Sequence, residues 1–185
     1  METEPDSCTE AGRGRPLDDI VAIIESAKAR GGRESLQRHI GKALPEADEA
    51  EVREATDVAI EVIDSIPVFL ARARQEGEER GLGSVVNPVL DHAEQYYLEP
   101  LDLIPEMTQG LVGLLDDSYL VIRSLQHLDS GPQAFLDWDL DDPARFLRRL
   151  IGVRIAQRLD QIATTAMQEV SDHLEEVWRR MAHEA

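Results

Sequence analysis

Cysteine, lysine and aromatic residues are scarce in this sequence, and long apolar runs are missing. Cys8 is the only cysteine among 185 residues, so a domain stapled by internal disulfides is excluded. No run of 18 apolar residues occurs, and the polar N-terminal residues lack the apolar stretch of a secretory signal. These absences predict a soluble, cytoplasmic protein, and membrane association is not expected.

Positive charge is also scarce. The chain has 19 basic and 37 acidic residues, which gives a net charge of −18. A negative chain is repelled by phosphate backbones, so nucleic acid is not an expected partner. Arginine accounts for 17 of the basic residues, a composition typical of GC-rich genomes or of a high-salt cytoplasm. The 42% of hydrophobic residues is enough for a packed core.

Apolar residues recur at helical spacing, and no segment shows the alternation of a strand. Residues 1–15 are polar and aperiodic, which predicts a disordered tail, and residues 16–185 are expected to form a single α-helical domain. The expected fold is an all-α bundle of six or seven helices. The predicted helices cover about 17–30, 34–43, 48–75, 87–99, 111–128 (in one or two pieces, with a junction near residue 116) and 142–181.

Prolines and glycines set the expected boundaries. Pro67 lies inside the apolar stripe of the third helix, so a kink or break is expected near Asp64. Residues 76–84 are polar and rich in glycine, which predicts a loop. Asn87 followed by Pro88 is typical of a capped helix start and therefore predicts that the next helix begins there.

The last predicted helix is unusually long. Asp142 and Pro143 form a second cap-plus-proline start, and only Gly152 is a weak point before residue 181. Its apolar spacing mixes threes and fours without clean heptads. Such a helix is a candidate for self-association or for contact with an unknown protein partner.

One short segment carries a family resemblance. Residues 96–106 read YYLEPLDLIPE, and residues 113–117 read GLLDD. The two prolines five residues apart and the downstream Asp pair resemble the signature of the YkvA-like family, a small bacterial and archaeal helical domain of unknown function. The resemblance covers about residues 96–125 and implies a proline-bent central hairpin at about 85–128, but it implies no activity. The motif residues are Tyr97, Pro100, Asp102, Pro105, Gly113, Asp116 and Asp117.

The sequence departs from this family pattern at two places. Glu106 stands where the family more often has Asp, and residues 107–110 are more polar than is usual. In one interpretation the acidic residues have structural roles, with Asp116 or Asp117 capping the following helix. In the other, Asp102, Glu106, Asp116 and Asp117 converge on a hard cation. Clustered carboxylates repel one another unless they share a proton or a cation, and Mg²⁺ and Ca²⁺ prefer oxygen ligands.

Arg145, Arg148 and Arg149 belong to the only local basic patch of the chain. In a structural role they would form ion pairs with the acidic residues that precede the last helix or with Asp116 and Asp117. In a functional role they would contact an anion or an acidic partner.

No catalytic residue is assigned. The sequence contains no P-loop, no Rossmann glycine pattern, no GxSxG elbow and no paired-histidine zinc motif. The leading hypothesis is a non-enzymatic cytoplasmic interaction or regulatory protein that recognises a partner, or itself, through a helix face. The alternative is a divalent-cation-dependent enzyme or sensor that uses the carboxylate cluster.

Overall fold

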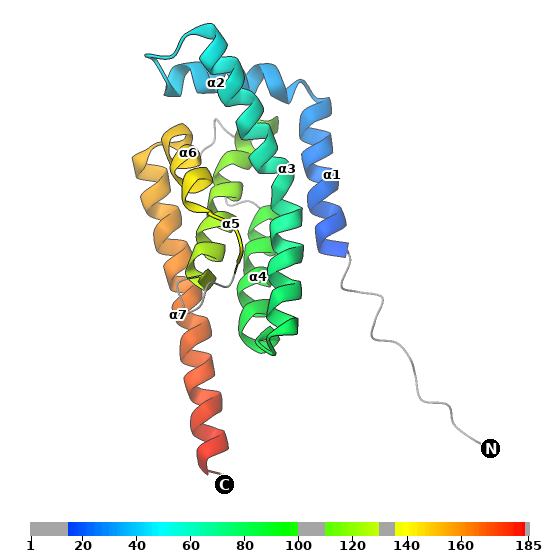
Figure 1. Cartoon of the computed structure of the whole chain (residues 1–185), viewed down its shortest axis with the longest axis vertical. Helices are drawn as coiled ribbons and strands as arrows, with labels where there is room; N and C mark the ends of the chain where they lie inside the picture. Colours follow the sequence, from blue (N-terminus) through cyan, green and yellow to red (C-terminus); the bar gives the residue numbers. More distant parts are fainter. Residues whose placement is uncertain (1–14, 100–109, 130–135, 184–185) are drawn as a thin grey trace, which may run out of the picture.

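A computed structural model of the chain describes residues 15–99, 110–129 and 136–183, and the side chains of residues 17–99, 110–128 and 136–168. This described part is a bundle of helices without a strand, as predicted (Figure 1). The predicted tail lies outside it except for Arg15, which already belongs to the first helix. The elements are α1 (Arg15–Ala29), α2 (Gly32–Ala43), α3 (Glu49–Glu79), α4 (Gly83–Leu98), the 3-10 helix η1 (Gly110–Gly113), α5 (Leu114–Asp129), α6 (Asp141–Ile151) and α7 (Val153–His183).

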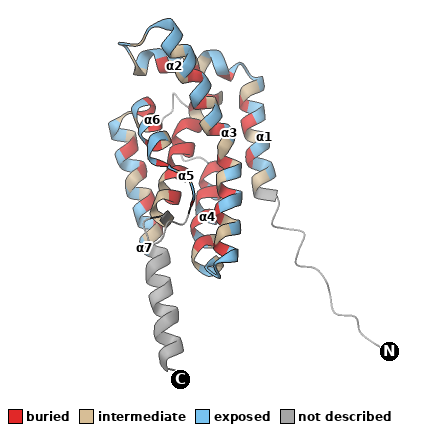
Figure 2. Ribbon diagram, viewed as in Figure 1, coloured by how far each residue is buried: buried red, intermediate tan, exposed pale blue. Residues whose placement is uncertain are grey.

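Helix α5 lies at the centre of the bundle. It packs against α3, α4, α6, α7 and η1, with α6 and α7 on one side in the view of Figure 1 and α3 and α1 on the other. Figure 2 shows that α5 is buried over most of its length. One apolar cluster draws buried residues from every helix of the described part. The most enclosed members of α5 are Leu115, Tyr119, Leu120, Val121, Ile122 and Leu125.

Helix α3 runs without interruption through Pro67, so of the predicted kink or break near Asp64 the break is wrong. Its start is well specified: the Asp48 side chain accepts backbone N–H bonds from Ala50 and Glu51, and Glu51 bonds back to Asp48. A proline in a helix interior costs about 3 kcal/mol. Buried residues on both sides of Pro67 anchor the helix in the core and offset this cost; they are Ile63, Ile66 and Leu70.

The predicted loop at 76–84 is also wrong, because α3 continues to Glu79 and the turn to α4 is short. Gly77 is a buried helical residue: a Cβ there would lie 3.0 Å from Val86 of α4. This glycine therefore permits close helix packing and does not end the helix. Helix α4 begins at Gly83, so Asn87 and Pro88 lie inside it and do not form its start.

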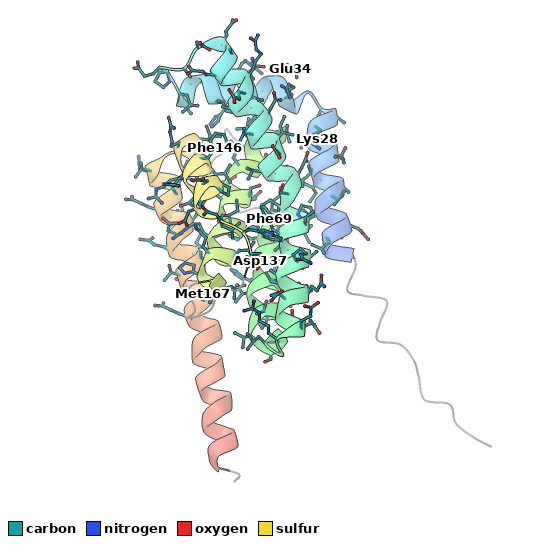
Figure 3. All side chains as sticks on the ribbon, viewed as in Figure 1. Lys28, Glu34, Phe69, Asp137, Phe146 and Met167 are labelled. Atoms are coloured by element: carbon teal, nitrogen blue, oxygen red, sulfur yellow. The ribbon has the colours of Figure 1, made fainter. Side chains whose placement is uncertain are left out.

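The predicted long C-terminal helix is two helices. Gly152 separates α6 from α7 with φ 84° and ψ 155°, a conformation that is essentially restricted to glycine. The chain reverses there, so α6 and the first half of α7 both pack against α5. The connector before α6 packs against α3. The centroid of the Trp138 ring lies 4.9 Å from the centroid of the Phe69 ring. Phe69 and Asp137, the residue before Trp138, are labelled in Figure 3.

Candidate functional site

A pocket of about 320 Å³ opens between α5 and α6. Its lining is polar and rich in guanidinium groups. It consists of Tyr119, Arg123 and Gln126 from α5 and of Asp141, Ala144, Arg145 and Arg148 from α6. In Figure 3 the label of Phe146 marks α6, which forms one wall. The lining has three arginines and one carboxylate, and two further carboxylates, Asp142 and Asp160, pair with these arginines, so the charges balance and the site is distinguished by its guanidinium donors.

Asp160 of α7 holds two of these arginines in position. Its Oδ1 accepts hydrogen bonds from Arg123 Nε at 2.7 Å and from the Tyr119 hydroxyl at 2.9 Å. Its Oδ2 accepts from Arg148 Nη1 at 2.7 Å, and the same nitrogen donates to the Tyr119 hydroxyl at 2.8 Å. The four side chains therefore form one hydrogen-bonded network that joins α5, α6 and α7.

The electrostatics of this network keep Asp160 ionised. Burial alone would raise its pKa, but hydrogen bonds from Arg148 and Tyr119 and the charge of Arg123 bring the pKa below its ordinary value. The hydrogen bond to Asp160, with that to Tyr119, raises the pKa of Arg148 in turn. The Asp160 carboxylate is only 25% exposed, so water screens these contacts less than it screens a surface pair.

The other polar residues of the pocket are tied to one another. Arg123 also donates from Nη1 to the Gln126 side chain, and Gln126 donates from Nε2 to Asp141 Oδ1 at 2.6 Å. Arg145 pairs with Asp142 at the exposed mouth, where its side chain is 73% accessible. Within the described part of the chain, these bonds do not use Nη2 of Arg123 or Nε and Nη2 of Arg148. Guanidinium donors held in a fork suit a carboxylate or a phosphate.

The structure brings two of the three predicted arginines together and separates the third. Arg145 and Arg148 line the pocket, whereas Arg149 lines a different groove of about 500 Å³ beside residues 43–47. The expected ion pair with the preceding acidic residues forms for Arg145. Arg148 pairs with Asp160, a residue that the prediction did not consider.

Sequence reasoning missed Tyr119, Arg123 and Asp160. Tyr119 and Arg123 are four residues apart, which places them on one face of a helix, and this spacing was the available signal. Asp160 faces Arg148 only because the chain turns back at Gly152. A continuous helix would have carried Asp160 three turns away from Arg148.

The predicted carboxylate cluster is described only in half. Asp116 and Asp117 lie in the first turn of α5 and are 6% and 2% exposed, whereas Asp102 and Glu106 lie outside the described residues. Within the described residues no group of three or more His, Cys, Asp or Glu is placed to hold a metal ion. Burial raises the pKa of Asp116 to about 6, and burial with the charge of Asp116 raises that of Asp117 to about 9.

Of the remaining motif residues, Tyr97 and Gly113 lie in the described part of the chain, close to Asp116 and Asp117 in the fold or the sequence. Tyr97 of α4 is buried, and its hydroxyl lies 3.5 Å from the Ser118 hydroxyl of α5. Burial, with the charge of Asp117, raises the pKa of Tyr97. Gly113 is the last residue of η1, directly before α5. Pro100 and Pro105, the predicted bend, lie outside the described residues.

Comparison with known proteins gives no relative: no protein-family model, curated protein or solved structure matches this chain. Among the described residues, no helix combines the length and the apolar character needed to cross a membrane.

Proposed function

We propose that this chain is a non-enzymatic regulatory protein that binds a small organic anion in the pocket between α5 and α6. The observation that carries the proposal is the Asp160 network, which holds Arg123 and Arg148 in fixed positions at the wall of a concave site. Preorganised donors bind an anion without the entropic cost of ordering long side chains at the moment of binding.

The volume and the charge of the pocket both define the ligand. About 320 Å³ is at the lower end of the range for small-molecule sites. The arginines offer bidentate hydrogen bonds that suit a phosphoryl or carboxylate group. Asp141 opposes an anion, so the ligand must approach from the side of Arg145 and Arg148. A compact metabolite with one such group satisfies these constraints.

Binding in this pocket has a route to regulation. Asp160 joins α5, α6 and α7, and Arg148 belongs both to that junction and to the pocket lining. A ligand that binds the remaining Nε and Nη2 donors of Arg148 changes how this guanidinium pairs with Asp160 and so biases how α6 packs against α7. An effector shifts such an equilibrium only through a difference in its affinity for the two arrangements.

Calorimetric titration with inorganic phosphate, pyrophosphate and succinate, at matched ionic strength, tests the proposal. We expect saturable binding of at least one probe. Arg145→Gln should weaken it about tenfold, because it removes a charged donor at the pocket mouth worth about 1.4 kcal/mol. Arg149→Gln is the matched control: it removes the same charge four residues along α6 but outside the pocket, and it should leave affinity within about twofold.

Asp141→Asn separates binding from structure. It removes the one negative charge of the lining while keeping an acceptor for Gln126, so it should tighten the binding of the anion. If no probe binds, or if Arg145→Gln and Arg149→Gln weaken binding equally, the network serves only to hold three helices together and the proposal fails.

Family and location remain part of the proposal. The segment from Tyr97 to Asp117 supports membership of the YkvA-like family, and the absence of cysteine pairs supports a reducing, cytoplasmic location.

Self-association through α7 is a second candidate function. Figure 1 shows the C-terminal half of α7 extending beyond the end of α4 and α5. The apolar spacing is mixed along most of this helix, but its last four apolar positions, 170, 174, 177 and 181, follow the four-three-four spacing of a coiled-coil seam. Ending the chain after Gln168 should leave the melting of the body unchanged and convert a dimer to a monomer in light-scattering measurements. A full-length monomer at high concentration contradicts this candidate.

A further inference from the structure

The start of α5 buries carboxylate oxygens that nothing in the described part of the chain satisfies. Asp116 Oδ1 and both side-chain oxygens of Asp117 are shielded from solvent and have no hydrogen-bond partner there. Buried polar atoms are almost always hydrogen-bonded, and an unpaired buried carboxylate is among the costliest exceptions. Each of these oxygens therefore needs a proton or a cation.

A residue of α4, the helix packed against α5, also carries a shielded polar atom without a partner among the described residues. The hydroxyl of Tyr96 on α4 is also shielded from solvent without a partner in the described residues, and the residue is only 7% exposed. Burial raises its pKa to about 12, and the charges of Asp117 and Asp116 contribute, so the hydroxyl lies within electrostatic reach of both carboxylates. Asp116 keeps backbone N–H bonds in its own turn, so the unpartnered atoms within the described part are its Oδ1, both oxygens of Asp117 and the Tyr96 hydroxyl, a set of oxygens that suits a cation.

We propose that Asp116, Asp117 and the Tyr96 hydroxyl form an oxygen-only site for a hard divalent cation at the junction of α4 and α5. The donors are two carboxylates and a phenol, without a sulfur or nitrogen ligand among them. Such a set selects Mg²⁺ or Ca²⁺ over zinc, and Mg²⁺ needs only one or two carboxylates because it retains several waters. The cation would neutralise a buried charge and lock α4 against α5.

The surrounding charges favour a cation over a fixed internal partner. Arg158 of α7 is the cationic side chain whose charge reaches Tyr96, and it forms no hydrogen bond with either Asp in the described part. On the other side, Asp64 of α3 adds negative charge near Tyr97. Lys28, a cation close to that side, is engaged by Asp64 at 2.6 Å. The pair is therefore left without a basic partner in the described residues.

The first test is thermal unfolding at pH 8 in chelator and in millimolar Mg²⁺, Ca²⁺ or Zn²⁺. Ionic strength is matched with NaCl, because screening alone stabilises a strongly charged chain. We expect Mg²⁺ or Ca²⁺, but not Zn²⁺, to raise the melting temperature by at least about 3 °C. Asp117→Asn should abolish this rise, whereas Asp137→Asn, the same change at an exposed connector position, should retain it.

Tyr96→Phe keeps the test independent of folding defects. It removes only an unpartnered hydroxyl, so the chelator-treated variant should melt at or above the wild-type temperature. The variant should nevertheless lose part of the ion-specific shift, and Tb³⁺ luminescence sensitised by the tyrosine should weaken with it. No ion-specific shift in the wild type, or a shift that Asp117→Asn retains, would overturn the proposal and leave Asp117 as a buried protonated acid.

Discussion

Asp160 shows how much of this molecule depends on single side chains that arrive from a different helix. One carboxylate accepts three hydrogen bonds from α5 and α6 and keeps two guanidinium groups at the pocket wall. Removing it leaves Arg123 and Arg148 partly buried without a counter-charge. These ion pairs stabilise the fold, and they also position Arg123 and Arg148, the arginines that supply donors to the proposed anion.

Asp160→Asn should lower the free energy of unfolding by about 1–3 kcal/mol at neutral pH, because it weakens three hydrogen bonds, two of them to charged donors. Urea unfolding measures this loss. The folded pKa of Asp160 lies below its ordinary value, so its contribution is complete above the unfolded pKa and disappears as pH falls through the folded one. Wild type and variant should therefore converge in strong acid. Asp142→Asn, whose carboxylate is 77% exposed, should change stability by less than about 0.5 kcal/mol.

The buried pair at the start of α5 has the opposite dependence on pH. The folded pKa values of Asp116 and Asp117, about 6 and about 9, lie above the ordinary value of 3.8. The folded state therefore binds more protons than the unfolded state, and their contribution to stability is lost as pH rises through these values. In chelator, Asp117→Asn should flatten the fall in urea midpoint between pH 5 and pH 8. An unchanged pH profile would show that the folded state holds no extra proton on Asp117 between pH 5 and pH 8.

At the scale of elements, periodicity predicted well and local breakers predicted poorly. The apolar stripes located α1 to α5 within a few residues and merged α6 with α7, and Asp48 marked the start of α3. The break allowed for at Pro67 and the loop predicted around Gly77 do not form, because burial against other helices offsets the local cost and one segment's sequence does not show that burial. The effect of Gly152 was predicted to be too small. The chain reverses at this residue, and the reversal allows both α6 and α7 to pack against α5.

The same distinction explains what was predictable in the candidate sites. Arg145 and Arg148 stand close together in sequence and were found. Tyr119, Arg123 and Asp160 come from two other helices, so their convergence depends on the packing of α5 against α7. The buried state of Asp116 and Asp117 likewise follows from the central position of α5, which no local pattern at its first turn reveals.

Gly152→Ala tests the importance of the turn between α6 and α7. The positive φ of Gly152 is strained for alanine although no atom lies within 4 Å of a Cβ there, so the variant should lose about 1–3 kcal/mol of stability. Gly41→Ala is the control: a Cβ in α2 makes only an ordinary contact with Val52, and the substitution should stabilise by about 0.5–1 kcal/mol. If urea unfolding shows that the two variants change the free energy of unfolding equally, the positive φ of Gly152 is not required for stability.

For the whole molecule, the net charge of −18 acts against compactness and makes stability depend on salt. At low ionic strength the repulsion among acidic residues extends over tens of ångströms, and at about 1 M salt it is confined to about 3 Å. We therefore expect the urea midpoint to rise as NaCl or KCl is increased from about 10 mM to about 500 mM. The two salts should act equally, since screening does not distinguish them.

A variant with less negative charge separates this long-range repulsion from any specific ion site. Glu54, Glu61 and Asp137 are exposed and make no ion pair within the described part of the chain. Their replacement by Gln, Gln and Asn reduces the net negative charge from −18 to −15. The core, the arginine pocket and the Asp116–Asp117 pair are left intact. The variant should be more stable than the wild type at low salt, and the difference should shrink as NaCl is raised. A salt response of unchanged slope would mean that local ion pairs, and not the summed charge, govern the effect of salt. The shift with a divalent cation should persist in this variant, because its ligands are untouched.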